Sequence, residues 1–510
     1  MPTRWRPMRP PSCRNWALPT PTMRAPARAL PPSAVPGSWP VARSPWTRRA
    51  LWLFAFAVLL LVAGRIPMFH SPDAHVHVAR ADMLAHGQVM LVPAPPGEPP
   101  QMGGSGGQVD QSLHAVAFLS LALLDTGKPD AERFRAVKAE AASMGWSGST
   151  RYFPAAGTGY YFPAVYLPHA AALWAARHLG LSMKASYRLL VATTLAVCLA
   201  LLAAAWRVRP PGLLVVAIVA TPMSLFQILS PTLDGITICL AVYAMHVYLD
   251  ALDTPPAPDD WRKGLLFALC AFLLITSRTN LLPMLALPFL LAWRKPSRAL
   301  WVIAIGLALA TLAWTLFALT ATIDTRLVRA HTSSQLIGIY LRDPAAFLQL
   351  LGRTLGDAPI LEFYLHSFFG ILGWLDAPIA RPWLVALAAL FAALGATTAL
   401  QAWHKGWQRP PAAQPTRPVD RAVVLALATA SCVLVFLALA VTWNDYPATK
   451  ILGVQGRYFF VPAIIAASLW RPVALRSQPR AAAVLQAGLL AAFVGTSMLA
   501  LVGTLNAAYH

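Results

Sequence analysis

Apolar runs close to the length of a membrane span recur along most of the 510-residue chain, with short polar turns between them. A helix needs about 17–25 mostly apolar residues to cross a bilayer, so this pattern predicts an all-α membrane protein. We expect about 11 transmembrane helices, several of them short. They lie near residues 50–67, 186–206, 211–230, 235–251, 264–278, 281–293, 299–320, 382–404, 421–442, 458–470 and 481–504.

Two long polar segments, 68–185 and 321–381, interrupt the pattern. Within the first, Tyr161–Leu179 is apolar enough to span, yet it contains Pro163, Pro168 and Arg177. We predict that it lies on the membrane surface or dips into it, as amphipathic helices do. The first polar segment is therefore expected to be an external loop with surface helices, and 321–381 a second large external segment.

The distribution of basic residues supports this threading. If Tyr161–Leu179 does not cross, every short basic turn falls on one side of the membrane, as the positive-inside rule requires for the cytoplasmic side. The N-terminus is then cytoplasmic. The basic residues of these turns are Arg207 and Arg209; Arg262 and Lys263; Arg294, Lys295 and Arg298; Lys405, Arg409, Arg417 and Arg421; and Arg471, Arg476 and Arg480.

Composition agrees with a membrane protein, with 57% hydrophobic residues and only 12% charged ones. The net charge of +21 does not indicate nucleic-acid binding, because much of it lies in residues 1–49, which hold nine Arg and no acidic residue. This Pro-rich segment is predicted to be a disordered cytoplasmic tail that fixes the orientation of the first span. Residues 50–510 form the polytopic membrane domain.

The first candidate site is the run Ser71–His77, directly after the first span. Asp73 fits two roles equally well: an N-cap of the helix that follows, or a general base at the membrane surface. His77 shares a helix face with Asp73 at i+4. A metal such as zinc or another divalent cation could also bind Asp73 and His77, although this spacing is a weak signal.

Further ionisable residues stand at the outer ends of expected spans. Asp234 follows a turn that begins at Ser230-Pro231; a turn often needs an Asp, but a charge at the edge of hydrocarbon favours a functional role. Arg457 follows two glycines, and its planar fork suits phosphate oxygens. A snorkelling interfacial Arg is the alternative. Arg278 is a second external Arg with a weaker case.

The fourth candidate segment is Ser367–Asp376, which mixes glycines and aromatic residues with one acid. This composition differs from that of a lipid-facing span. A re-entrant or surface helix would explain it without a functional role.

Together these segments resemble the bacterial polytopic membrane family numbered 2142 among domains of unknown function, over roughly residues 50–470. The resemblance rests on motifs in the family's order: Pro72-Asp73 with His77, Pro163-x-x-Tyr166-x-Pro168, Pro222-Met223 with Asp234, Gly370-x-x-Gly373-Trp374-Leu375-Asp376, and Gly453-Val454-Gln455-Gly456-Arg457-Tyr458. The last run is the most specific. The family usually has Glu after Pro-Asp, and Ala74 here removes a second oxygen ligand, which puts metal dependence in doubt.

The family is similar in layout to superfamily C glycosyltransferases. That likeness implies a sugar donor linked to polyprenyl phosphate, a glycan or lipid acceptor in the cell envelope, and a site at the outer face of the bacterial inner membrane. Asp73 and Asp234 would be catalytic. The substrate-binding residues would be His77, Arg278, Asp376, Gln455, Arg457 and Tyr458.

Two other functions stay open. A transporter or flippase for a lipid-linked or anionic solute would need charges at mid-membrane, whereas here they stand at span ends. A non-catalytic partner in envelope polysaccharide assembly is compatible with Ala74. The enzyme hypothesis makes one geometric prediction: Asp73, Asp234 and Arg457 should converge on one outward-facing cavity, with Asp73 within about 12 Å of Arg457.

Overall fold

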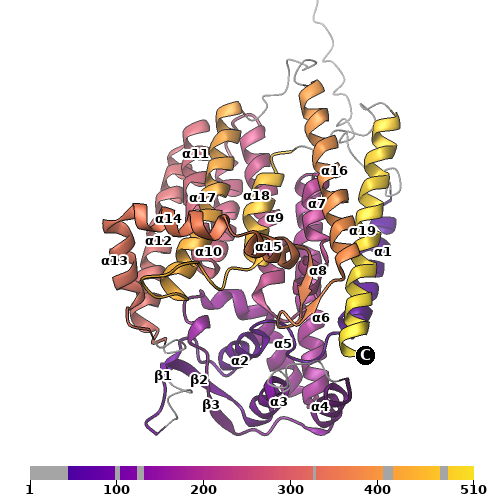
Figure 1. Cartoon of the computed structure of the whole chain (residues 1–510), viewed down its shortest axis with the longest axis vertical. Coiled ribbons are helices and arrows are strands. Elements are labelled where there is room, and N and C mark those ends of the chain that lie inside the picture. Colours follow the sequence, from indigo (N-terminus) through magenta and orange to yellow (C-terminus); the bar gives the residue numbers. More distant parts are fainter. Residues whose placement is uncertain (1–43, 98–103, 123–130, 325–328, 406–416, 471–479) are drawn as a thin grey trace, which may run out of the picture.

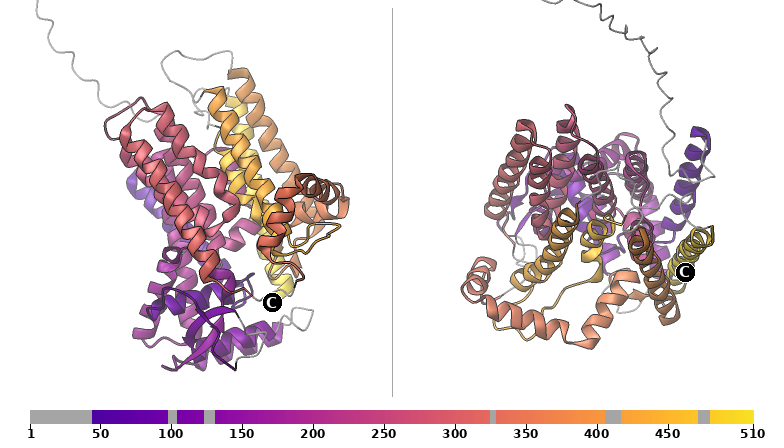
Figure 2. Two further views of the ribbon diagram at one scale, coloured as in Figure 1. Left: turned by 90° about the vertical axis from the view of Figure 1, so that its left-hand side faces the viewer. Right: turned by 90° about the horizontal axis from the view of Figure 1, so that it is seen from above.

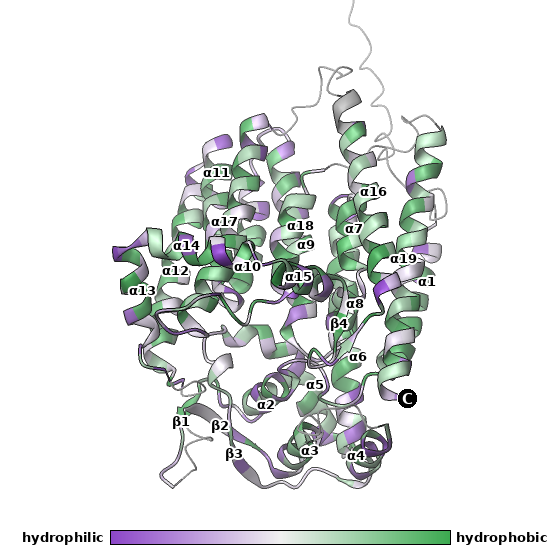
Figure 3. Cartoon of the chain, in the orientation of Figure 1, coloured by the Kyte–Doolittle hydropathy of each residue, from purple (hydrophilic) through white to green (hydrophobic). Residues whose placement is uncertain are grey.

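The computed structural model describes residues 44–97, 104–122, 131–324, 329–405, 417–470 and 480–510. Long helices stand side by side as a bundle, and a smaller unit of short helices and strands covers one end of it (Figure 1). Hydrophobic residues predominate along the long helices, and hydrophilic ones gather on the smaller unit (Figure 3). Most of the predicted tail, 1–49, lies outside the described residues.

Seven helices of the described chain are long and apolar enough to cross a membrane. One differs from the others: α9 has 83% of its most apolar window buried, against 33% or less elsewhere. It is the central helix and packs against α6 and α10. The seven helices are α1 (Pro45–Ala63), α6 (Met183–Val208), α9 (Leu233–Asp253), α12 (Arg298–Ala321), α16 (Arg381–Lys405), α17 (Pro418–Thr442) and α19 (Arg480–Tyr509).

The expected count of 11 spans is not confirmed, because the other four segments are short, interrupted or charged at one end. Proline breaks two of them, since it lacks an N–H and disfavours helix in the residue before it. The region 211–230 becomes α7 (Leu213–Val219) and α8 (Pro222–Ile228), and 281–293 becomes η5 (Thr279–Leu285) and α11 (Ala286–Arg294). The others are α10 (Asp260–Ser277), whose first turn is polar, and η6 (Gly456–Phe459) with α18 (Phe460–Ala467).

The unit at the end of the bundle is formed by the first polar segment. It contains a small antiparallel sheet in the order β1-β2-β3, which an all-α prediction did not include. Helix α5 has 12 residues. At 1.5 Å per residue it is about 18 Å long and cannot cross a ~30 Å hydrocarbon core by itself. The elements are α2 (Ala74–Ala85), β1 (Val92–Pro93), β2 (Ser105–Asp110), α3 (Gln111–Ala122), α4 (Ala131–Ser143), β3 (Thr150–Pro154), η3 (Ala156–Thr158), η4 (Pro163–Tyr166) and α5 (Leu167–His178).

The second polar segment forms short helices along one side of the bundle (Figure 2). These are α13 (Ser333–Arg342), α14 (Pro344–Leu355) and α15 (Ala358–Gly370), followed by the strand pair β4 (Ile371–Leu372) and β5 (Ala377–Pro378). Helices α13 and α14 bury Leu336 and Leu350 but expose Leu341 and Leu348. A helix with apolar residues on its outer face as well is typical of the membrane interface.

The basic turns and the smaller unit lie at opposite ends of the bundle (Figure 1). Ion pairs join several helix ends at the basic side: Arg209 Nη1 lies 3.3 Å from Asp253 Oδ2, and Arg294 Nη2 lies 2.6 Å from Asp420 Oδ1. This arrangement agrees with the segregation that the positive-inside rule assumes.

Candidate functional site

Four charged side chains from distant parts of the chain meet where the smaller unit joins the bundle. Arg457 lies between two carboxylates: its Nη2 is 3.6 Å from Asp73 Oδ2, and its Nη1 is 3.5 Å from Asp234 Oδ2. Arg278 pairs with the other oxygen of Asp234. The three residues predicted to converge, Asp73, Asp234 and Arg457, are therefore close together, while the outward-facing cavity expected around them stays a prediction. Two acids and two guanidinium groups also balance one another in charge, which limits the cost of burying them.

Asp73 is held in an unusual backbone conformation. Its φ of 62° and ψ of 8° lie in the left-handed region, which non-glycine residues seldom adopt. Among the described residues, only Phe69 and Leu375 share a positive φ without being glycine. Trp374, next to Leu375, donates from Nε1 to the Phe69 carbonyl oxygen at 3.3 Å, so the three strained residues lie in one region. Strain of this kind clusters at functional sites.

The side chain of Asp73 does not act as a helix cap. Asp73 occupies the N-cap position of α2, yet its carboxylate accepts no capping hydrogen bond. It is 54% exposed and faces Arg457 instead. Partial desolvation of the carboxylate acts to raise its pKa, but the charge of Arg457 outweighs this and the pKa is lowered. The carboxylate is therefore ionised at neutral pH, and it does not make the capping hydrogen bond that was one of its two expected roles.

Arg457 is buried, with a side chain only 5% exposed. Its Nε and Nη1 have no hydrogen-bond partner within the part of the chain that the structure describes. The preceding glycine places it there: the Gly456 N–H donates to Ser367 Oγ at 2.7 Å, and a Cβ on Gly456 would lie 2.4 Å from the Tyr364 carbonyl oxygen. Buried guanidinium N–H groups are normally satisfied, so this group is suited to accept an additional anionic or polar ligand.

Asp234 is in the first turn of α9, and Arg278 is the residue at which α10 ends. A Cβ at Gly235 would lie 2.5 Å from the Gln227 carbonyl oxygen, so the Asp-Gly pair lets α9 begin against α8. The Arg278 guanidinium also lies over the Tyr161 ring, 6.0 Å from its centroid. Sequence reasoning gave Arg278 the weaker case, yet it is a direct partner of Asp234.

His77 lines the site from one turn further along α2. Its Nδ1 is 2.8 Å from the Tyr166 hydroxyl, and its ring stacks on Tyr161 at 6.1 Å between centroids. Burial lowers the pKa of His77 to about 3, so the ring is neutral at physiological pH. No group of three or more His, Cys, Asp or Glu that could hold a metal occurs in the described chain. We therefore make no metal proposal for Asp73 and His77.

Three other predicted residues lie differently. The Asp376 carboxylate is engaged in a second cluster, 2.8 Å from His70 Nε2 and accepting from the Tyr509 hydroxyl at 3.2 Å. Gln455 is next to Arg457 in sequence, and its Oε1 is buried without a hydrogen-bond partner among the described residues. The Arg457 guanidinium lies over the Tyr458 ring, and its Cζ is 5.4 Å from the ring centroid.

Sequence reasoning missed the roles of His70, Tyr161 and Tyr509. His70 stands three residues before Asp73, and its partner Asp376 is 306 positions away. No local pattern marks such a pair. The sequence marks Tyr161 only as the start of a surface segment, and Tyr509 lies beyond the last expected span, 481–504.

The fold and the charge cluster thus define a polytopic α-helical membrane protein with a polar site at one end of its bundle. The model of the family described as "Predicted membrane protein (DUF2142)" matches residues 55–466, and the chain belongs to this family. No curated protein and no solved structure matches the chain. The family match establishes the membrane class and contact with the lipid bilayer, but it specifies no activity.

Proposed function

We propose that this protein is a glycosyltransferase of superfamily C type, which moves a sugar from a polyprenyl-phosphate donor to a cell-envelope acceptor at the outer face of a bacterial inner membrane. One observation supports it above all: an accessible carboxylate, Asp73, stands 3.6 Å from a buried guanidinium, Arg457, whose Nε and Nη1 have no hydrogen-bond partner in the described chain. Base and leaving-group stabiliser must flank one sugar carbon, and this pair is close enough to do so.

The reaction would break the bond between the sugar's anomeric carbon and the phosphate oxygen and form a bond to the acceptor hydroxyl oxygen. Asp73 would take the hydroxyl proton. Arg457 and Arg278 would stabilise the charge that develops on the departing lipid phosphate. Asp234 contacts both arginines, so its role would be to position them.

The ion pair between Asp73 and Arg457 also provides a way to activate the base. With Arg457 beside it, the Asp73 carboxylate has a lowered pKa and is a weak base. A donor phosphate that binds Arg457 would bring negative charge next to Asp73 and offset the effect of the guanidinium. The pKa of Asp73 would then rise when the donor is bound, because a neighbouring like charge disfavours the ionised form.

The test is transfer by the purified protein from a panel of polyprenyl-phosphate sugars, read as released polyprenyl phosphate. We expect Asp73→Asn to lower the rate by about 100-fold or more, the range seen when a general base is lost. Arg457→Lys should weaken donor binding as well as turnover, because Lys lacks the planar fork. Asp445→Asn serves as the matched control, since Asp445 is a partly exposed, paired Asp bonded to His331.

Three results would contradict the proposal. One is the absence of lipid phosphate release with every donor, given folded protein. Another is equal loss of activity in the Asp445→Asn control. The third is an Asp73→Asn variant that turns over like the unmodified chain.

A further inference from the structure

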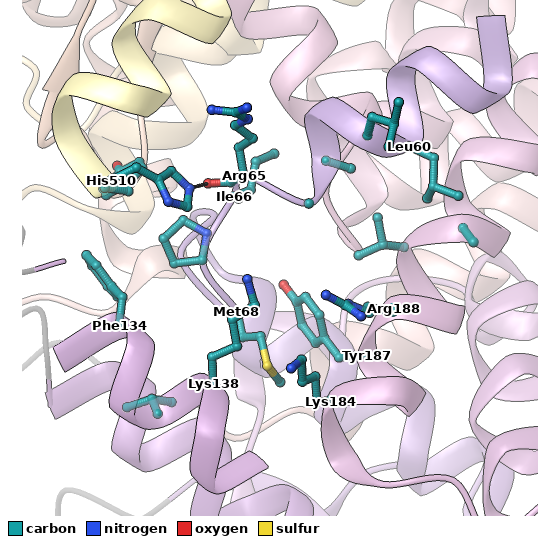
Figure 4. Close-up of a pocket in the computed structure, with 18 of the residues that line it drawn as sticks. Leu60, Arg65, Ile66, Met68, Phe134, Lys138, Lys184, Tyr187, Arg188 and His510 are labelled. Atoms are coloured by element: carbon teal, nitrogen blue, oxygen red, sulfur yellow. Dashed lines mark hydrogen bonds between the residues drawn. The ribbon is translucent and has the colours of Figure 1, made fainter. Parts of the chain in front are cut away.

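A second region with charged side chains lies between α1, α4, α6 and the end of α19, next to Phe69, one of the residues with a positive φ. It is a cavity of about 520 Å³ (Figure 4). This volume falls in the range of roughly 300–1,000 Å³ that is typical of ligand sites. Tyr187, on its wall, accepts a hydrogen bond from the Phe69 N–H at 3.0 Å, so the cavity adjoins Phe69 but is separate from the charge cluster.

The charge of this cavity is one-sided. Its lining contains five Lys or Arg and, over the same described residues, no Asp or Glu: Arg65, Arg135, Lys138, Lys184 and Arg188. Partial burial, followed by the charges of Arg188 and Lys184, lowers the pKa of Lys138, which shows that these cations crowd one another. Like charges held together without an acid destabilise a fold, so an anionic partner would relieve a real cost.

The remaining wall is apolar and adjoins the lipid-facing surface. Leu60, Leu61 and Val191 line it, and they belong to the predicted spans α1 and α6. Only 11% of the α1 window is buried inside the protein, and Leu61 is 76% exposed. The cavity therefore combines a cationic rim at the ends of two spans with an apolar wall that continues toward hydrocarbon.

We propose that this cavity binds an anionic phospholipid, with the phosphate among Lys138, Lys184 and Arg188 and an acyl chain along α1 and α6. A soluble anion would use the cations but not the apolar wall, and an uncharged lipid would do the reverse. Only an anionic lipid matches both, which is how basic pockets between membrane helices recognise headgroups. This inference concerns a different site from the proposed glycosyl transfer and does not depend on it.

The experiment uses the full chain in nanodiscs made of phosphatidylglycerol and phosphatidylcholine in equal amounts. Lipid that remains bound after transfer to detergent is counted by native mass spectrometry. We expect one phosphatidylglycerol to be retained in preference to phosphatidylcholine. The triple variant Lys138→Ala, Lys184→Ala, Arg188→Ala should lose this preference by about tenfold or more, since each basic residue adds to the attraction for an anionic lipid.

The matched control removes the same charge elsewhere: Arg298→Ala, Arg342→Ala, Arg353→Ala, all exposed and outside the cavity. It should retain the lipid, as should Lys138→Arg with Lys184→Arg. If the triple variant does not purify in folded form, Lys184→Gln alone should weaken retention about threefold. Asp73→Asn should leave retention unchanged, which separates this site from the proposed active site.

Three outcomes would overturn the proposal. Equal retention of both lipids, or unaltered preference in the folded lining variants, would show that the cavity does not select an anionic lipid. Displacement of phosphatidylglycerol by an equal concentration of soluble glycerol 3-phosphate or inorganic phosphate would show that the apolar wall contributes nothing and that the site binds a free anion.

Discussion

The two charged regions, the Arg457 cluster and the cavity near Lys184, manage charge in opposite ways. Around Arg457, two carboxylates and two guanidinium groups compensate one another in charge. In the cavity near Lys184, five cations face no Asp or Glu side chain among the described lining residues. A cluster whose charges balance suits a site that must bind and release substrate repeatedly, because a bound phosphate takes the place of a carboxylate beside the guanidinium group. A cavity with unbalanced positive charge suits an anionic ligand that stays bound.

Both regions should face the same side of the membrane, and cysteine labelling tests this with an all-or-none result. In a chain with Cys13 replaced by Ser, Ala139→Cys on α4 should react with an impermeant thiol reagent in cells with a permeabilised outer membrane. Ala257→Cys, in the turn before α10, should react only after lysis. Both positions are exposed. Labelling with the reverse pattern would invert the topology.

Ser105, which the sequence would suggest as an external labelling position, is unsuitable. The structure buries it, and its Oγ accepts a hydrogen bond from the Ile323 N–H at 2.8 Å. The Cys13→Ser chain without an added cysteine supplies the background labelling of the remaining cysteines, of which Cys198 and Cys239 are buried.

Removing one cation should lower the free energy of unfolding strongly in the Arg457 cluster and should leave it almost unchanged, or raise it, in the cavity. Arg457→Met leaves Asp73 and Asp234 with a single cation, and we expect a loss of about 3 kcal/mol in the free energy of unfolding. Lys184→Met removes a repelling charge and should change stability by less than about 0.5 kcal/mol, or raise it. Unfolding in mixed micelles with increasing dodecyl sulfate measures both. Similar losses in the two variants would remove the distinction between the regions.

His77, beside the Arg457 cluster, should make the free energy of unfolding depend on pH. Burial lowers the pKa of His77 to about 3 in the folded state, below the ~6.5 of an unfolded chain. The stabilising contribution is therefore present above about pH 6.5 and is lost as pH falls toward 3, because the unfolded state binds the proton first. At pH 5 the loss is about 2 kcal/mol.

The measurement is the difference in unfolding free energy between the unmodified chain and His77→Gln, taken from pH 7 to pH 4.5. The variant cannot titrate at this position, so the difference should shrink as pH falls. A difference that is constant with pH would show that His77 does not keep a depressed pKa in the folded protein. Other buried histidines contribute equally to both chains and cancel.

The smallest expected effect concerns the hydrogen bond that holds the His77 ring. Tyr166→Phe removes the hydroxyl 2.8 Å from His77 Nδ1 and should cost about 1 kcal/mol at pH 7, the usual value of such a bond. Tyr152→Phe is a control within the same unit, because its buried hydroxyl donates to the Gly104 carbonyl oxygen and is remote from His77 in sequence. Under the proposed function, only Tyr166→Phe should also reduce transfer. Equal effects of both variants on transfer would indicate a purely structural role for Tyr166.

The membrane class and the charged residues at the ends of apolar runs could be predicted from the sequence, and seven of the 11 expected spans correspond to long apolar helices. Length and hydropathy are local properties, and a span must satisfy its backbone within its own helix, so these features can be read without the fold. The convergence of Asp73, Asp234 and Arg457 was predictable for a related reason. Each is an ionisable group at the same end of an apolar run, where an unpaired charge is costly.

Tertiary structure alone decided the rest. The left-handed conformation of Asp73, the pairing of Arg278 with Asp234 and that of Asp376 with His70 depend on contacts between segments far apart in the chain. The cationic cavity arises because the ends of α1, α4 and α6 meet, and no local pattern records that their basic residues face one another. Pairing and strain are properties of packing, and packing is not local.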